Sequence, residues 1–110
     1  MTRYNSLVMA TSRFPVGEET LRDFCHKRHI RRLALFGSAL RDDFGPQSDV
    51  DILVEFEPGH VPGFLRLAAM ERDLSDLLGG RKVDMRTPAD LSRYFRDEVV
   101  AGAVVQYAER

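Results

Sequence analysis

The sequence lacks tryptophan and any long apolar run, and it holds a single cysteine, Cys25. One cysteine cannot form an internal disulfide, and this usage is typical of a reducing compartment, so we expect a cytoplasmic protein. No segment approaches the roughly 20 apolar residues that a transmembrane helix needs. The first residues also lack the apolar region of a signal peptide. We therefore expect no membrane partner.

An excess of charge of either sign is also missing. The formal net charge is −1 and the pI is about 6.3. Proteins with a general affinity for nucleic acid usually have a strongly basic face, so we expect no strong nucleic-acid binding. The exception is a local basic cluster, "HKRHIRR" over residues 26–32. Such a cluster is usually a solvated helix end, and a docking or RNA-facing patch is the alternative.

The length of 110 residues suits one compact domain, and the hydrophobic fraction of 44% supplies its core. Residues 1–17 show no clear period, and we expect them to form an N-terminal arm. Residues 18–110 carry helical and strand-like patterns in turn, and we expect them to form the domain.

Hydrophobic periodicity and turn residues predict an alternation of helices and strands. The expected elements are a helix at 18–29, a strand at 30–37, a short helix at 38–44, a strand at 49–56, a helix at 64–78, a strand at 82–86 and one or two helices over 88–108. This order predicts an α/β (α+β) domain in which helices flank a small mixed or antiparallel sheet.

Some apolar and aromatic residues are expected to serve packing alone. The helix at 64–78 repeats core residues at helical spacing, namely Leu67, Met70, Leu74 and Leu77. For Tyr94 and Tyr107 we expect half-buried packing, with partner contacts as the alternative. Cys25, His26 and His29 suggest zinc, but three ligands on one helix without a second cluster have poor geometry.

Two aspartates, Asp49 and Asp51, stand one residue apart in the apolar strand "DVDILVEF". Side chains at i and i+2 of a strand point to the same face, with backbones about 6–7 Å apart. Two carboxylates this close repel, and a divalent cation removes the conflict. Oxygen ligands of this kind suit Mg²⁺, which completes its shell with water and substrate phosphates. Without Asp51 beside it, Asp49 would be interpreted as a turn residue.

The pair Gly37-Ser38 stands where a strand gives way to the expected short helix, with Ser38 as its N-cap. Glycine allows close approach of a ligand, and the first N–H groups of a helix are free to bind phosphate. Arg41 would reach a phosphate from the same helix face, or pair in solvent with Asp42 or Asp43. A phosphate cradle beside paired carboxylates predicts a site for a metal-bound nucleoside triphosphate. Without the nearby carboxylates, the Gly-Ser pair would be interpreted as an ordinary C-cap and N-cap.

A third carboxylate, Asp84, lies in the short strand "KVDMR". If that strand pairs beside "DVDILV", three acids would hold two metal ions about 3.5–4 Å apart. Asp84 would also accept the proton of an attacking hydroxyl. The plainer alternative is an edge-strand charge. Asp43 and Glu55 are expected to be surface charges. They are the next candidates for the third carboxylate if Asp84 does not fill this role.

These residues resemble a known family. A Gly-Ser pair, "SDVD" and a later lone aspartate at this spacing are similar to the DNA polymerase β-type nucleotidyltransferase superfamily. The stretch "LFGSALRDDFGPQSDVDILVEFEPG" is most similar to its minimal nucleotidyltransferases, which include antitoxins paired with HEPN-domain toxins. The resemblance runs from about Glu18 to Tyr107, with Asp42 standing where many members have glycine.

The resemblance implies the polymerase β-type fold and Mg²⁺-dependent transfer of a nucleotidyl group, most often AMP from ATP, to a hydroxyl. It places Gly37 and Ser38 on the triphosphate. It places Asp49, Asp51 and Asp84 on the metal ions. Arg41 remains a nucleotide-binding candidate from its position alone.

Two functions follow. The first is an adenylyltransferase that modifies a HEPN toxin, most plausibly on a tyrosine, and so acts as its antitoxin. The second is an antitoxin that neutralises its partner by occlusion with little catalysis, as part of an oligomer with it. The acid triad favours the enzyme, because a pure binder gains nothing from clustered carboxylates. An enzyme that modifies a small molecule, such as an aminoglycoside, is a third alternative. The short segment after Asp84 favours a macromolecular acceptor.

Overall fold

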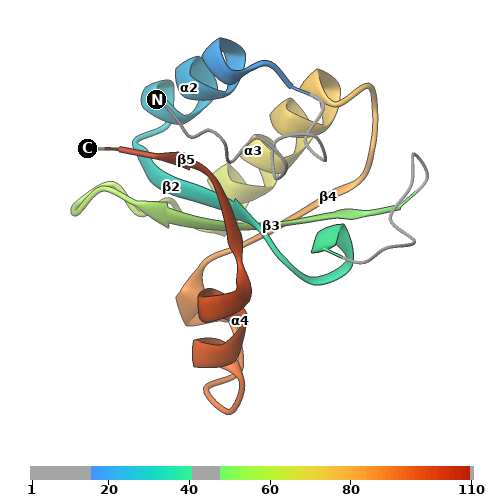
Figure 1. Cartoon of the computed structure of the whole chain (residues 1–110). Helices are drawn as coiled ribbons and strands as arrows, with labels where there is room; N and C mark the ends of the chain where they lie inside the picture. The colour runs from blue at the N-terminus through green and yellow to red at the C-terminus, as the bar shows by residue number, and fades with distance from the viewer. Residues whose placement is uncertain (1–15, 41–47, 110) are drawn as a thin grey trace.

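The structure of the protein is a computed structural model that describes residues 16–40 and 48–109 (Figure 1). Residues 1–15 of the expected arm and Arg41 of the expected site lie outside the described residues. No helix within the described ranges has both the length and the apolar character that a membrane crossing requires.

The centre of the fold is a four-stranded sheet with the strand order β4-β3-β2-β5. Its strands are β2 (Ile30–Leu35), β3 (Val50–Phe56), β4 (Val83–Arg86) and β5 (Val104–Ala108). β2 pairs antiparallel with both β3 and β5, whereas β3 and β4 are parallel. The sheet is therefore mixed, which confirms the predicted fold class.

Helices α2 (Glu18–Lys27) and α3 (Phe64–Leu77) cover one face of the sheet (Figure 1). α3 is the crossover that a parallel pair of strands requires, since it links β3 to β4. α4 (Arg96–Gly102) extends from the other side of the sheet. Two 3-10 turns, η1 (Gly37–Leu40) and η2 (Pro88–Asp90), complete the elements of the described residues.

The core lies between the sheet and helices α2 and α3. Strand alternation explains it, because Ile52 and Val54 point into the core from β3 while Leu53 points to the other face. The largest fully buried side chains are those of Ile30, Leu33, Leu35, Ile52, Leu74, Val50, Val54 and Cys25. Full burial of one such aliphatic side chain contributes roughly 1.5–3 kcal/mol.

The predicted core face of α3 is partly wrong. Met70 and Leu74 are buried and Leu67 packs against the core, as expected. Leu77 is 44% exposed, however, and Leu78 is buried in its place. The α-helix ends at Leu77, so the chain turns there and brings the next side chain inward.

The predicted helix over 88–108 is also wrong at its end, because residues Val104–Ala108 form β5. Two adjacent β-branched residues, Val104 and Val105, favour a strand, and β2 offers an open edge to pair with. Tyr107 packs against the core as predicted, whereas Tyr94 is 84% exposed, contrary to the expected half-buried packing.

Candidate active site

The candidate site begins where Gly37 meets Asp51, at the start of β3. The Phe36 amide donates a hydrogen bond to the Asp51 carbonyl at 3.1 Å, which brings the turn after β2 beside this residue. Gly37 has a φ of +59°, and a Cβ placed on it would lie 2.6 Å from Asp51 Oδ2. Glycine therefore suits this position, because the backbone is left-handed and a Cβ would displace the Asp51 carboxylate.

Asp51 and Asp84 are register partners on the parallel strands β3 and β4. Adjacent strands lie about 4.8 Å apart, so their side chains leave the sheet as neighbours. Both point away from α2 and α3, because the alternate residues Ile52 and Met85 are in the core. The predicted pairing of "KVDMR" beside "DVDILV" is thus confirmed. The Asp84 carboxylate, 38% exposed, also contacts Arg86 Nε at 3.4 Å.

Asp49 directly precedes β3, and its side chain is more exposed than that of Asp84. The Val50 amide donates to the Lys82 carbonyl at 2.9 Å, which holds the two strand starts together. Lys82 Nζ lies 4.0 Å from Asp49 Oδ2. An exposed pair at this distance is worth little, so the lysine can be displaced by a more strongly bound cation.

The Gly-Ser turn differs from the expectation. Gly37 begins η1 and Ser38 lies within it, so Ser38 does not precede the helix as an N-cap. The described part is a four-residue 3-10 turn, whereas a longer helix was expected. Arg41, predicted to contact a phosphate, lies outside the described residues together with Asp42 and Asp43.

Glu55, the reserve candidate for the third acid, lies toward β2 and not toward β4. Its Oε2 is 3.6 Å from Arg32 Nη1, and Arg32 is its register partner. The expectation of a surface charge is confirmed. Within the described residues, the structure brings Asp84 and not Glu55 beside Asp51. The resulting carboxylate oxygens are the donors that Mg²⁺ prefers, so the residues fit this metal.

A cavity of about 630 Å³ opens beside Asp84, and sequence reasoning did not find it. It lies between the start of α3 and β4, with Val61, Phe64 and Leu67 on one wall and Asp84 and Arg86 on the other. Phe64 is 83% exposed. The cavity therefore brings exposed apolar side chains close to the β4 position that carries Asp84.

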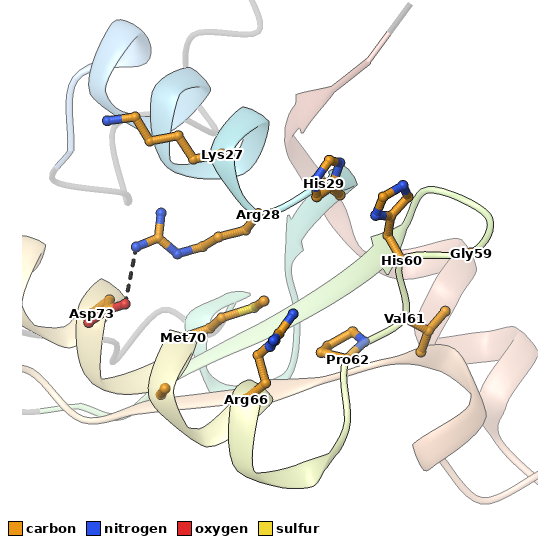
Figure 2. Close-up of a pocket in the computed structure, with 11 residues that line it drawn as sticks. Lys27, Arg28, His29, Gly59, His60, Val61, Pro62, Arg66, Met70 and Asp73 are labelled. Carbon is orange, nitrogen blue, oxygen red and sulfur yellow. Dashed lines mark hydrogen bonds and ion pairs between the residues drawn. The ribbon is translucent and has the colours of Figure 1, made fainter.

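A second cavity, of about 470 Å³, contains none of the predicted site residues (Figure 2). Lys27, Arg28 and Arg66 line it, so it is basic in character. Arg28 is held there by an ion pair with Asp73 at 3.1 Å and by stacking over the Phe24 ring at 4.0 Å. Lys27 ends α2 and Arg28 is its C-cap, whereas Arg31 and Arg32 lie in β2, so the predicted helix end accounts for only the first part of the basic cluster.

The zinc alternative for Cys25, His26 and His29 does not hold. Cys25 is fully buried in the core, and burial raises the pKa of its thiol to about 12. A thiol must lose its proton to bind metal, so this one is a poor ligand. His29 instead lies beside Glu57 and His60, a grouping that sequence reasoning missed because its members are far apart along the chain.

The family model described as nucleotidyltransferase domain matches residues 18–105. The Methanocaldococcus jannaschii protein named "Putative protein adenylyltransferase MJ0128" is 44% identical over 54% of this chain and 57% of its own length. The protein "Putative protein adenylyltransferase MJ0435" of the same organism is 33% identical over 71% of this chain and 81% of its own length. The chain thus spans little more than half of the first relative.

Solved structures agree with the sequence matches. A structure described as a minimal nucleotidyltransferase has a TM-score of 0.61 and 31% identity, and it covers 83% of this chain and 97% of its own. A crystal structure of a toxin–antitoxin with AMP-PNP has a TM-score of 0.68 over 86% of this chain and 76% of its own. At 18% identity, the second likeness concerns the fold alone. Together these matches confirm the family resemblance predicted from the Gly-Ser and Asp-x-Asp motifs.

Proposed function

Because the chain belongs to the nucleotidyltransferase domain family, we propose that it is a Mg²⁺-dependent protein adenylyltransferase. It transfers AMP from ATP to a tyrosine hydroxyl of a HEPN-domain toxin and thereby acts as the antitoxin. One observation carries the proposal: Asp51 is in register with Asp84, and its carboxylate lies where a Cβ on Gly37 would be. The names of the relatives, which are protein adenylyltransferases, support a protein as the acceptor.

Each predicted site residue has its own role in the proposed reaction. Asp49, Asp51 and Asp84 would hold Mg²⁺, and the bound metal would supply charge neutralisation at the triphosphate and activation of the acceptor hydroxyl. Gly37 leaves its backbone open to the triphosphate, beside Ser38. The acceptor oxygen forms a bond to the α-phosphorus, the bond from that phosphorus to the bridging oxygen breaks, and pyrophosphate leaves. Asp84 accepts the proton of the acceptor hydroxyl.

The position of the 630 Å³ cavity supports a macromolecular acceptor. Exposed apolar side chains, those of Val61 and Phe64, line the same cavity as Asp84. A partner protein that covers these side chains would lie next to β4, close to Asp84. The same exposed surface favours the second candidate, neutralisation by tight binding with little catalysis.

The test uses a HEPN-domain toxin as the candidate partner. We would incubate the two with ATP and Mg²⁺ and measure the intact mass of the partner. Addition of AMP that Asp51→Asn abolishes and Asp76→Asn leaves unchanged supports the enzyme. Asp76 is a matched control, because it is exposed on α3 and outside the site. An unmodified partner that is inhibited in a stable complex would contradict catalysis and support occlusion.

A further inference from the structure

A cluster of metal-ligating side chains lies at the end of the sheet opposite the carboxylates. His29 directly precedes β2 and Glu57 directly follows β3, and the register pair Ile30 and Phe56 brings these two positions together. The Glu57 amide donates to the His29 carbonyl at 2.9 Å, and the His60 amide donates to the Glu57 carbonyl at 3.0 Å. The backbone therefore fixes all three residues in one place.

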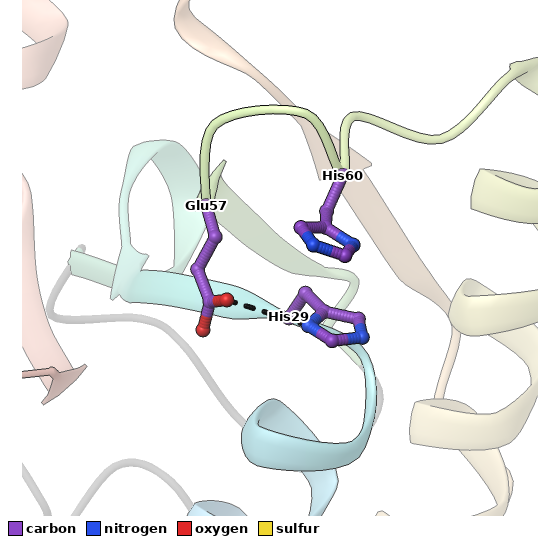
Figure 3. A group of neighbouring side chains, drawn as sticks. All are labelled: His29, Glu57 and His60. Carbon is purple, nitrogen blue, oxygen red and sulfur yellow. Dashed lines mark hydrogen bonds and ion pairs between the residues drawn. The ribbon is translucent and has the colours of Figure 1, made fainter.

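The three side chains converge (Figure 3). His29 Nδ1 is 3.3 Å from Glu57 Oε1, and the rings of His29 and His60 stack with centroids 3.8 Å apart. One ligand atom from each residue lies within 4.8 Å of the other two. Ligands of a tetrahedral zinc ion are about 3.3 Å apart, given Zn–N bonds of about 2.0–2.1 Å. The two rings stack at an interplanar angle of 15°, so they must rotate until a nitrogen of each points to one ion, and both side chains are exposed and have room to turn.

The backbone at His29 is a second, independent observation. Its φ is 58°, and among the described residues it is the one non-glycine residue with a positive φ. The position follows Arg28, the C-cap of α2, where glycine is the usual residue because it adopts this conformation without strain. Histidine at this position costs about 1–2 kcal/mol relative to a relaxed backbone. Strain of this kind is often kept where the side chain has a function.

We propose that His29, Glu57 and His60 bind a divalent transition-metal ion, with zinc as the physiological candidate. Imidazole nitrogens suit zinc, copper and nickel, whereas Mg²⁺ prefers oxygen ligands alone. Two histidines and one glutamate are an established zinc ligand set that leaves one position open to water. This site is distinct from the carboxylates of Asp51 and Asp84, and it does not depend on the proposed activity.

The surroundings support the assignment. Glu109 adds a second carboxyl beside Glu57, and its amide donates to the Arg31 carbonyl at 2.8 Å at the end of β5. His60 also lines the 470 Å³ cavity, so the open position faces solvent (Figure 2).

The experiment titrates the full chain with zinc chloride in calorimetry, with excess Mg²⁺ present to occupy the carboxylates. We expect one zinc ion per chain. His60→Ala, His29→Asn and Glu57→Gln should each weaken binding at least about tenfold. Asparagine tolerates the positive φ of residue 29, so that variant keeps the turn. His26→Ala is the matched control, because it removes the third histidine of the chain, which is exposed on α2, and should change nothing.

A second measurement, the change in melting temperature on adding zinc, tests the proposal for variants whose stability is reduced. Zinc should raise the melting temperature of the unmodified chain and of His26→Ala, and should not raise that of His60→Ala. Zinc binding that survives both His60→Ala and His29→Asn would overturn the proposal. So would binding that is lost with Asp84→Asn and kept by all three cluster variants, since the zinc would then occupy the carboxylate site.

Discussion

The carboxylate of Asp51 fills the space that a side chain on Gly37 would need, with 2.6 Å between Oδ2 and an added Cβ. This contact joins the predicted phosphate-binding turn to the predicted metal ligand. A change at Gly37 therefore acts on both halves of the site at once.

We predict that Gly37→Ala abolishes transferase activity and lowers stability by more than backbone strain alone. A non-glycine residue in the left-handed region costs about 1–2 kcal/mol. Gly79→Ala measures that strain by itself, because Gly79 has a φ of +74° and open space around its Cβ position. Melting curves and ATP binding would compare the two variants. Equal loss of stability, with ATP binding intact in both, would contradict the importance of the contact.

A second prediction concerns Mg²⁺. ATP binding measured by calorimetry should be strong with Mg²⁺ and weak after addition of a chelator. Asp51→Asn should bind ATP with Mg²⁺ no better than the unmodified chain does without it. The variant should fold, with stability raised by about 0.5 kcal/mol or less, because it relieves repulsion between carboxylates. Equal ATP affinity with and without Mg²⁺ would contradict the metal site. Strong destabilisation by Asp51→Asn would indicate that Asp51 is a structural residue.

Most of the fold was predictable, because the order of elements follows from local patterns. The site was predictable for the same reason, since Asp49 and Asp51 share a strand and one assumption about pairing adds Asp84. The pairing was confirmed by the register of Asp51 with Asp84. The roles of these residues remain predictions.

The failures occurred where tertiary contacts decide the outcome. The segment Val104–Ala108 was read as helix, but pairing with the edge of β2 makes it β5. The His29, Glu57 and His60 cluster has no sequence signature, because antiparallel pairing of β2 and β3 assembles it from distant positions. Tyr94 is exposed for a related reason: no described segment covers the start of α4.

A third prediction concerns Cys25. Burial raises the pKa of its thiol from 9.0 to about 12, and the thiolate is the reactive form. At pH 9 we expect iodoacetamide to modify the denatured chain at least about 100-fold faster than the folded one. Intact mass reports the reaction unambiguously, because the chain has one cysteine. Comparable rates in both states would contradict the burial of Cys25.

The same pKa shift predicts how stability depends on pH. The folded state keeps the thiol proton up to about pH 12, whereas the unfolded state loses it above pH 9. The stabilising contribution is therefore complete below pH 9 and is lost as the pH rises from 9 toward 12. Cys25→Ala should show a shallower loss of stability over this range in denaturant unfolding. An unchanged slope would mean that Cys25 does not titrate differently in the two states.

The last prediction separates nucleotide binding from transfer. Under the proposed function, Asp49 and Asp51 would hold one metal ion on the triphosphate, whereas Asp84 would act on the attacking hydroxyl. Asp84→Asn should therefore keep much of the ATP affinity and lose transfer to the partner by a factor on the order of 10²–10⁴. Asp49→Asn should weaken both, and Asp76→Asn should change neither. Calorimetry measures the affinity, and the intact mass of the partner over time measures transfer. If Asp84→Asn transfers at the full rate, another acid is the third carboxylate, and Asp43 would be tested next because Glu55 is paired with Arg32.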